Sequence, residues 1–305
     1  MPAAGPIRRP DEKSRCSMNV SMKNHDFPIP IGPQSLVAIA VPLSDRVGFT
    51  EEEEISLLHL NHHLGQFDRF FIIPEHLGVD VSGFKTKRFS AEYFGSVDAH
   101  RRLLFSASFY DAFADYQFVL IYHLDALVFS NELVKWCEAG FDYIAAPWVR
   151  HPDTPYFGNA EYEGKVGNGG FSLRRVSSFL AVLNSRKRWR SPFRRVVHEV
   201  LHGTPGERRQ CFINFFRYWR PEYNGVRNEM ASFSRNEDHF WPNRAAHYYP
   251  PFKVASADIA LQFAFECVPG YCFELNGRRL PFGCHAWSRY DRNFWMPYLI
   301  SKKSG

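Results

Sequence analysis

Apolar and polar residues follow two different periods along the first half of the chain. Short, nearly continuous apolar runs rich in β-branched and aromatic residues predict strands at 35–42, 67–74, 85–90, 117–123 and 141–148. Between these runs, apolar residues recur at helical spacing and predict helices at 50–67, 100–116 and 132–140. Strands of this kind that alternate with helices are typical of α/β proteins. We therefore expect a mixed, mostly parallel sheet flanked by helices, in a single domain.

The predicted helix at 50–67 has the clearest local signals. Thr50 is the expected N-cap, Glu53 follows three residues later as in a capping box, and acids fill the first turn. Ile55, Leu57 and Leu58 would form the buried stripe of this helix.

The second half of the chain is less regular. A glycine-rich stretch at 166–175 leads into a helix at 176–184, and another helix is expected after Asn236, broken near Pro242. The segment 186–220 between them has apolar residues spaced as in an amphipathic helix. This basic segment holds ten Arg or Lys against two Glu, a net charge of +8, whereas the whole chain carries +5.

The basic segment 186–220 has three interpretations. It could be a charged face in contact with water, a site for an anionic partner such as a phospholipid, lipid phosphate or charged acceptor, or a nucleic-acid site, for which the overall charge alone does not argue.

No apolar run reaches the ~20 residues that span a bilayer, and the N-terminus lacks the apolar core of a signal peptide. Residues 1–33, rich in Pro, Gly and charge, predict a disordered tail. We expect a cytoplasmic protein or one peripheral on a membrane.

Four short motifs carry candidate chemistry. His123 and Asp125 end the apolar strand at 117–123, where parallel sheets bind ligands and where an aspartate suits a divalent cation, although it could equally cap the next helix. The glycines at 167–170 allow close approach of backbone to a ligand, or form a plain turn. Glu237 and Asp238 precede a helix and could supply a general base or only cap it. His285 is either a metal ligand or a buried core histidine.

Together, YHLDALVF, DYIAAPW, VGNGGFSLRR, NEDHFW and LPFGCHAW occur in the order of nucleotide-sugar glycosyltransferases of the GT-A fold. More closely, they resemble the uncharacterised, glycosyltransferase-like family called domain of unknown function 5672. The resemblance covers about residues 35–290. In the GT-A fold, the last acid of a D-x-D-type motif binds the Mn²⁺ or Mg²⁺ that bridges the phosphates of a UDP-sugar. That role falls to Asp125, with Leu124 before it and His123 in place of the first acid.

The resemblance implies further roles for single residues. It implies that His285 is a second metal ligand and that Asp238 is the catalytic base, with Glu237 as the second candidate for that base. The remaining residues implied in donor binding are Val41, Pro42, Arg46, Arg102, Gly169 and Gly170. Those implied on the acceptor side are Trp148, Asn168 and Trp287, although such aromatic rings could equally belong to the core.

The resemblance thus implies an inverting, metal-assisted UDP-sugar glycosyltransferase of carbohydrate biosynthesis, acting on a hydroxyl of a glycan, lipid-linked glycan or protein. Its domain would span 34–298, with a nucleotide-binding half at 34–150 and an acceptor and catalytic half at 151–298. Two alternatives remain. His123 in place of the first acid fits a catalytically inactive carbohydrate- or nucleotide-binding protein, and the basic segment fits a membrane- or nucleic-acid-binding module. A retaining mechanism is also compatible with this fold.

Overall fold

The computed structural model describes residues 35–43, 48–189 and 191–300. Residues Gln34–Gly305 form one compact unit. The predicted tail at 1–33 and the predicted donor residue Arg46 lie outside the described residues.

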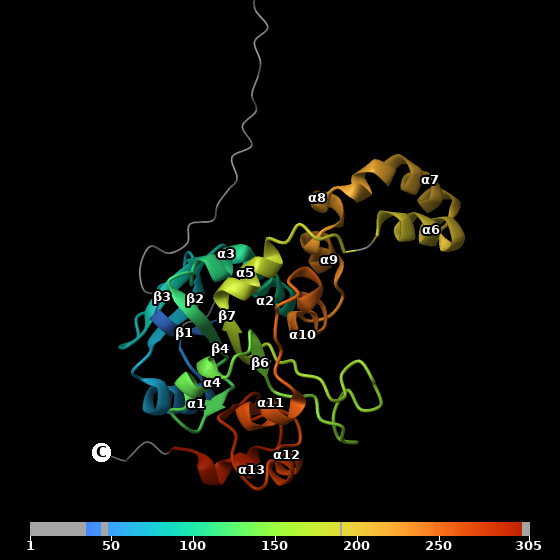
Figure 1. Ribbon diagram of the computed structural model, residues 1–305. Coiled ribbons are helices and arrows are strands. Elements are labelled where there is room, and N and C mark those ends of the chain that lie inside the picture. The colour runs from blue at the N-terminus through green and yellow to red at the C-terminus, as the bar shows by residue number, and fades with distance from the viewer. Residues whose placement is uncertain (1–34, 44–47, 190, 301–305) are drawn as a thin grey trace, which may run out of the picture. The chain divides into compact units, whose positions relative to one another are not determined.

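A six-stranded sheet forms the centre of this unit (Figure 1). Its order is β3 (Lys85–Phe89), β2 (Asp68–Pro74), β1 (Ser35–Pro42), β4 (Tyr116–Tyr122), β7 (Phe171–Arg175) and β6 (Tyr143–Ala145). The first four strands are parallel, and β7 runs antiparallel to both of its neighbours. The predicted mixed, mostly parallel sheet is confirmed. The strand β7 was not predicted, and β6 is shorter than the apolar run that predicted it.

Helices lie on both sides of the sheet (Figure 1). The helices α3 (Ala107–Asp111) and α5 (Val176–Leu183) lie on one side, and α1 (Glu51–Leu64) and α4 (Leu133–Glu138) on the other. The core between these layers is apolar; β4 alone buries Phe118, Val119, Leu120 and Ile121.

Local signals account for where several helices begin. The capping box of Thr50 and Glu53 at α1 is confirmed. The buried apolar residues of α1, however, are Leu57, Leu60 and Leu64, because the helix is rotated from the expected stripe. The predicted helix at 100–116 is two helices, α2 (Val97–Leu104) and α3, because Ser106 caps a new helix start.

A second, small sheet brings the C-terminal part of the chain to the end of β4. Its order is β5 (Leu127–Val128), β9 (Gly283–Cys284) and β8 (Ala264–Phe265). The helices α11 (Ala257–Phe263), α12 (Pro269–Leu275) and α13 (Arg292–Trp295) surround it. A separate apolar cluster that includes Trp287 and Trp295 fills this region.

In the described part of the chain, five helices lie between α5 and α11. They are α6 (Pro192–His202), α7 (Pro205–Asn214), α8 (Pro221–Asn224), α9 (Val226–Ser232) and α10 (Glu237–Tyr248). The predicted break of α10 at Pro242 is wrong, since the helix continues past it to Tyr248. Pro242 is the sixth residue of α10, so its missing N–H removes the hydrogen bond to the carbonyl of Asp238, but the residues after it remain helical. Short 3₁₀ turns occur at Ala91–Tyr93, Phe215–Trp219 and Met296–Tyr298. In the described part of the chain, no helix is long and apolar enough to span a bilayer.

Candidate active site

Three potential metal ligands meet where β4 ends. His123 and Asp125 follow β4 directly, and His285 follows β9. The pairing of Leu127 with Cys284 between β5 and β9 places His285 beside Asp125, 160 residues away in the sequence. One ring nitrogen of each histidine and one carboxylate oxygen of Asp125 all lie within 4.8 Å of one another.

The atoms between Asp125 and His285 have unsatisfied hydrogen-bonding capacity. Asp125 Oδ1 and His285 Nε2 are 3.2 Å apart, which is ion-pair distance. Both atoms are nevertheless buried and, within the described residues, neither has a partner in hydrogen-bonding geometry. The two atoms are close but not aligned for a hydrogen bond, and a buried polar pair of this kind still needs another partner. A cation between the two atoms would satisfy both.

His285 is also held from its other side. Its Nδ1 lies 3.0 Å from Oε1 of Glu266, the residue after β8. Burial opposes the charged ring, but the Asp125 and Glu266 carboxylates outweigh it and raise the pKa of His285 to about 10. At neutral pH the ring therefore carries a proton on both nitrogens. A bound cation would displace the Nε2 proton, and the ring, still donating Nδ1–H to Glu266, would then offer its Nε2 lone pair, an arrangement common in metal sites.

His123 belongs to a chain of histidines. Its Nε2 lies 3.1 Å from Nε2 of His100 on α2, and its ring packs edge-on against His285. Burial lowers the pKa of both rings, to about 4 for His100, and nearby positive charge adds to the effect. Neutral imidazole is the form that binds metals. The substitution of His123 for the first acid of the motif therefore leaves a competent ligand in that place.

The three side chains fit a divalent cation. Two imidazoles and one carboxylate suit a transition metal such as Mn²⁺ better than Mg²⁺, which prefers an all-oxygen shell. The unsatisfied Asp125 Oδ1 and His285 Nε2 point to the same conclusion.

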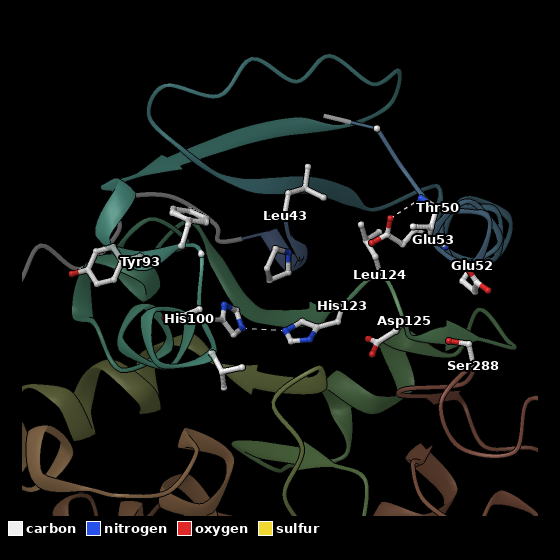
Figure 2. Close-up of a pocket in the computed structure, with 16 residues that line it drawn as sticks. Leu43, Thr50, Glu52, Glu53, Tyr93, His100, His123, Leu124, Asp125 and Ser288 are labelled. Atoms are coloured by element: carbon white, nitrogen blue, oxygen red, sulfur yellow. Dashed lines mark hydrogen bonds between the residues drawn. The ribbon is translucent and has the colours of Figure 1, made fainter. Parts of the chain in front are cut away.

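A cavity of about 680 Å³ opens above these ligands. Figure 2 shows His123 and Asp125 on its floor, with His100 and Tyr93 on one side and the start of α1 on the other. The end of β1 contributes Pro42 and Leu43. Within the described part of the chain, no Lys or Arg lines the cavity, and its two acids other than Asp125 are engaged: Glu53 caps α1 and Glu52 pairs with Arg292.

The glycine loop before β7 touches the metal group and the acidic pair. The carbonyl of Gly170 accepts from the His123 N–H at 2.8 Å. A Cβ on Gly170 would lie 2.0 Å from His285 Nε2, and one on Gly169 would lie 2.8 Å from Glu237 Oε1. A side chain at Gly170 would therefore displace the His285 ring, and one at Gly169 would push the Glu237 carboxylate from its place beside Arg174. The predicted close approach is therefore to protein side chains.

Glu237 and Asp238 at the start of α10 have different surroundings. Glu237 is buried and paired with Arg174, whose Nη2 is 2.9 Å from its Oε1. The same guanidinium donates to Tyr110 and Ser172. Among the described residues, Asp238 forms no ion pair; burial and then the charges of Glu237 and Glu266 raise its pKa to about 7.

The three residues expected on the acceptor side are all buried. Trp287 is fully buried in the second apolar cluster. Trp148 stacks on His239 and fills the space against Gly167. The side-chain oxygen of Asn168 accepts from the backbone N–H groups of Gly170 and Phe171, so it holds the loop. None of the three lines the cavity.

Two expected donor residues also lie elsewhere. Val41 is fully buried in β1, one position before the cavity-lining Pro42. Arg102 lies on α2, but its guanidinium pairs with Asp98 and donates to the carbonyl of Glu92, and it does not line the cavity. His123, Leu124 and Asp125 do line it.

Sequence reasoning missed His100 and Glu266. Glu266 ends an apolar run, AFE, in the same way that Asp125 follows one, and that signal could have been used. His100 carried no such signal, since only the packing of α2 beside the end of β4 places it at His123.

The candidate metal centre lies beyond the carboxyl ends of the parallel strands. Open α/β sheets bind their ligands in this place. Residues 83–285 match the family described as Protein of unknown function (DUF5672), and the chain belongs to it. No curated protein matches the chain.

Several solved structures of glycosyltransferases are similar over most of the chain. The apo form of GlyE from Streptococcus pneumoniae TIGR4 matches with a TM-score of 0.41 and 10% identity, over 88% of this chain and 61% of that one. The galactosyltransferase LgtC in complex with donor and acceptor sugar analogs gives 0.44 and 11%, over 88% and 98%. A glycosyltransferase involved in glycosylation of the major capsid of PBCV-1 gives 0.39 and 9%, over 82% and 92%. The chain spans about three fifths of the GlyE structure. We base the function on the site rather than on these similarities.

Proposed function

We propose that the protein is a metal-dependent, inverting glycosyltransferase that uses a UDP-sugar, as the GT-A resemblance of its motifs implies. The observation that carries this proposal is the group of His123, Asp125 and His285, of which His123 and Asp125 line the floor of the cavity. A divalent cation held there would neutralise the diphosphate of the donor and stabilise the departing UDP.

A nucleoside diphosphate brings at least two negative charges, which a divalent cation held by His123, Asp125 and His285 would balance. Pro42 and Leu43, at the end of β1, would contact the nucleoside, because the ends of neighbouring parallel strands form the ligand site of such sheets.

Asp238 is the proposed general base. Its neighbour Glu237 is committed to Arg174, and the pKa of about 7 at Asp238 suits a group that accepts a proton near neutral pH. We assign Glu237 a positioning role instead. A single base on the acceptor side implies direct displacement, with inversion at the anomeric carbon. The acceptor is a hydroxyl of a glycan, lipid-linked glycan or protein.

Thermal unfolding with UDP, GDP, CMP and dTDP, each with and without Mn²⁺, tests the donor site. A ligand at about 100 times its Kd adds roughly 2.7 kcal/mol to stability. We expect UDP with Mn²⁺ to raise Tm most, and neither alone to do so to the same extent. Stabilisation by UDP that is independent of Mn²⁺ would remove the metal from the proposal. A larger effect of another nucleotide would contradict the choice of donor.

Turnover distinguishes the enzyme from a binding protein of the same fold. UDP release from a panel of UDP-sugars should require Asp125 and Asp238. If UDP and Mn²⁺ bind tightly but no UDP-sugar is hydrolysed or transferred, the catalytically inactive alternative is correct. The configuration of the product, measured by NMR, decides between inversion and retention.

A further inference from the structure

Large apolar side chains are exposed in one part of the molecule far more than elsewhere. Among the described residues, nine of the fifteen exposed large apolar side chains lie between Phe193 and Tyr223. Phe193, Leu201, Phe212 and Phe216 are 68%, 64%, 67% and 79% exposed. Single exposed apolar residues are normal on a protein surface, but such a concentration marks an interaction surface.

The helix α6 divides this region into two faces. Phe193, Val197, Val200 and Leu201 recur at helical spacing and are all exposed. Arg194, His198 and His202 are exposed on the remaining circumference. In a helix that covers a protein core the apolar stripe is buried, whereas here the apolar stripe faces solvent.

The next helix repeats this composition. The helices α6 and α7 lie side by side as a hairpin (Figure 1). Phe212 and Ile213 near the end of α7, and Phe216 just after it, are exposed, as are Arg208, Arg209 and Arg217. The two helices and the turn that follows, residues 192–219, are called the basic hairpin below.

Aromatic rings and guanidinium groups are in contact at the base of this hairpin. The guanidinium of Arg188 lies 5.1 Å from the centre of the Trp219 ring, and that of Arg217 lies 5.4 Å from the centre of the Tyr223 ring. Both rings are about half exposed. Amphipathic aromatic rings beside basic groups are typical of protein segments at the interface between lipid headgroups and acyl chains.

We propose that the basic hairpin docks the protein on an anionic phospholipid surface. The exposed apolar side chains would enter the headgroup and upper acyl region, and the arginines would contact lipid phosphates. Nucleic acid would use the arginines but leaves the aliphatic residues Val197, Val200, Leu201 and Ile213 without a role. A bilayer uses both sets of residues. This inference does not depend on the proposed transferase activity.

Sedimentation of the full chain with vesicles tests the proposal. We expect binding to phosphatidylcholine vesicles that contain phosphatidylglycerol, much weaker binding to pure phosphatidylcholine, and weakening with salt. The charge variant is Arg194→Ala, Arg208→Ala, Arg209→Ala, Arg217→Ala, and it should lose about fivefold in affinity for each arginine removed. The apolar variant is Leu201→Ser, Phe212→Ser, Phe216→Ser, and it should lose about tenfold or more in total.

The matched control is Leu275→Ser, Met296→Ser, which removes two exposed apolar side chains outside the hairpin. It should bind vesicles as the unaltered protein does. All of the substituted positions are exposed, so Tm should change little in each variant.

Three outcomes would overturn the proposal. The unaltered protein could fail to bind anionic vesicles. The apolar variant could bind them as tightly as the unaltered protein, which would leave a purely electrostatic surface open to any polyanion, including an oligonucleotide. Light scattering could show a dimer that the apolar variant dissociates, without vesicle binding, in which case a second copy of the chain covers this face.

Discussion

His285 is contacted by two carboxylates, Asp125 at its Nε2 and Glu266 at its Nδ1. Asp125 lies on the cavity floor, whereas Glu266 fixes the ring from behind and does not line the cavity. Acids that orient a metal-binding histidine in this way affect metal binding through it.

Replacement of Glu266 should therefore weaken metal binding without removing a ligand. We expect Glu266→Gln to bind Mn²⁺ on the order of 10–100-fold more weakly, measured by calorimetry. The control is Glu274→Gln, which alters an exposed pair with Arg278. Unchanged Mn²⁺ affinity in Glu266→Gln would show that His285 is not a ligand.

Asp238 should give the proposed transferase activity a pH dependence. Its carboxyl must be ionised to accept a proton, and its pKa is raised to about 7. The rate should fall about tenfold per pH unit below 7 and level off above it. Asp238→Asn should lower kcat by roughly 10²–10⁴-fold at every pH. A pH profile that is flat from pH 5 to 8 would contradict the assignment.

The same pKa shift has a consequence for stability, of opposite sign. A carboxyl whose pKa is higher in the folded than in the unfolded state favours folding when protonated, and this contribution is lost as pH rises through about 7. Asp238→Asn should thus raise Tm relative to the unaltered protein at pH 8, and the difference should vanish near pH 4. A lower Tm of the variant at pH 8 would mean that the charged form is stabilised.

At the scale of elements, a buried ion pair joins β7 to α10. Arg174 is fully buried and Glu237 nearly so. Removing one partner leaves an uncompensated charge and costs about 3–5 kcal/mol. We expect Glu237→Gln to lower Tm by roughly 10 °C, and the double variant Arg174→Met, Glu237→Leu to recover most of the loss. A double variant as unstable as the single one would indicate that the pair is worth more than apolar packing.

The close contact of Gly170 with His285, the residue after β9, gives a second prediction at the scale of elements. The Cβ of Gly170→Ala would occupy the position of His285 Nε2, so the ring must move. We expect Mn²⁺ binding to be lost. The control is Gly78→Ala, where a Cβ meets no atom within 4 Å. If Gly170→Ala bound Mn²⁺ normally, the loop would have to be more adaptable than its hydrogen bonds to Asn168 indicate.

At the scale of the whole molecule, the cavity and the basic hairpin share no residue. Effects at independent sites add. The rise in Tm caused by UDP with Mn²⁺ should therefore be the same in the unaltered protein and in the Leu201→Ser, Phe212→Ser, Phe216→Ser variant. A smaller rise in the variant would show that the hairpin influences the nucleotide site.

The parts of this fold that the sequence predicted depend on neighbouring residues. The apolar runs predicted β1, β2, β3 and β4 within one or two residues, and Thr50 with Glu53 marked the start of α1. These signals are local because burial on both faces of a strand, or a cap at a helix end, requires particular residues at adjacent positions. The same local pattern placed His123 and Asp125 at the end of a strand.

Which distant side chains lie close together depends on long-range strand pairing and helix packing. The pairing of β5 with β9 brings His285 to Asp125, and packing of α2 brings His100 to His123. Glu237 and Asp238 look equivalent in the sequence, but their buried surroundings differ. Glu237 neutralises Arg174, whereas burial and nearby acids raise the pKa of Asp238. Burial also placed Trp148 and Trp287 in the interior, because aromatic residues near a site fill its supporting core as readily as they face a ligand. Local sequence patterns thus account for the elements and for the kinds of chemistry available, whereas long-range packing accounts for which residues share a site.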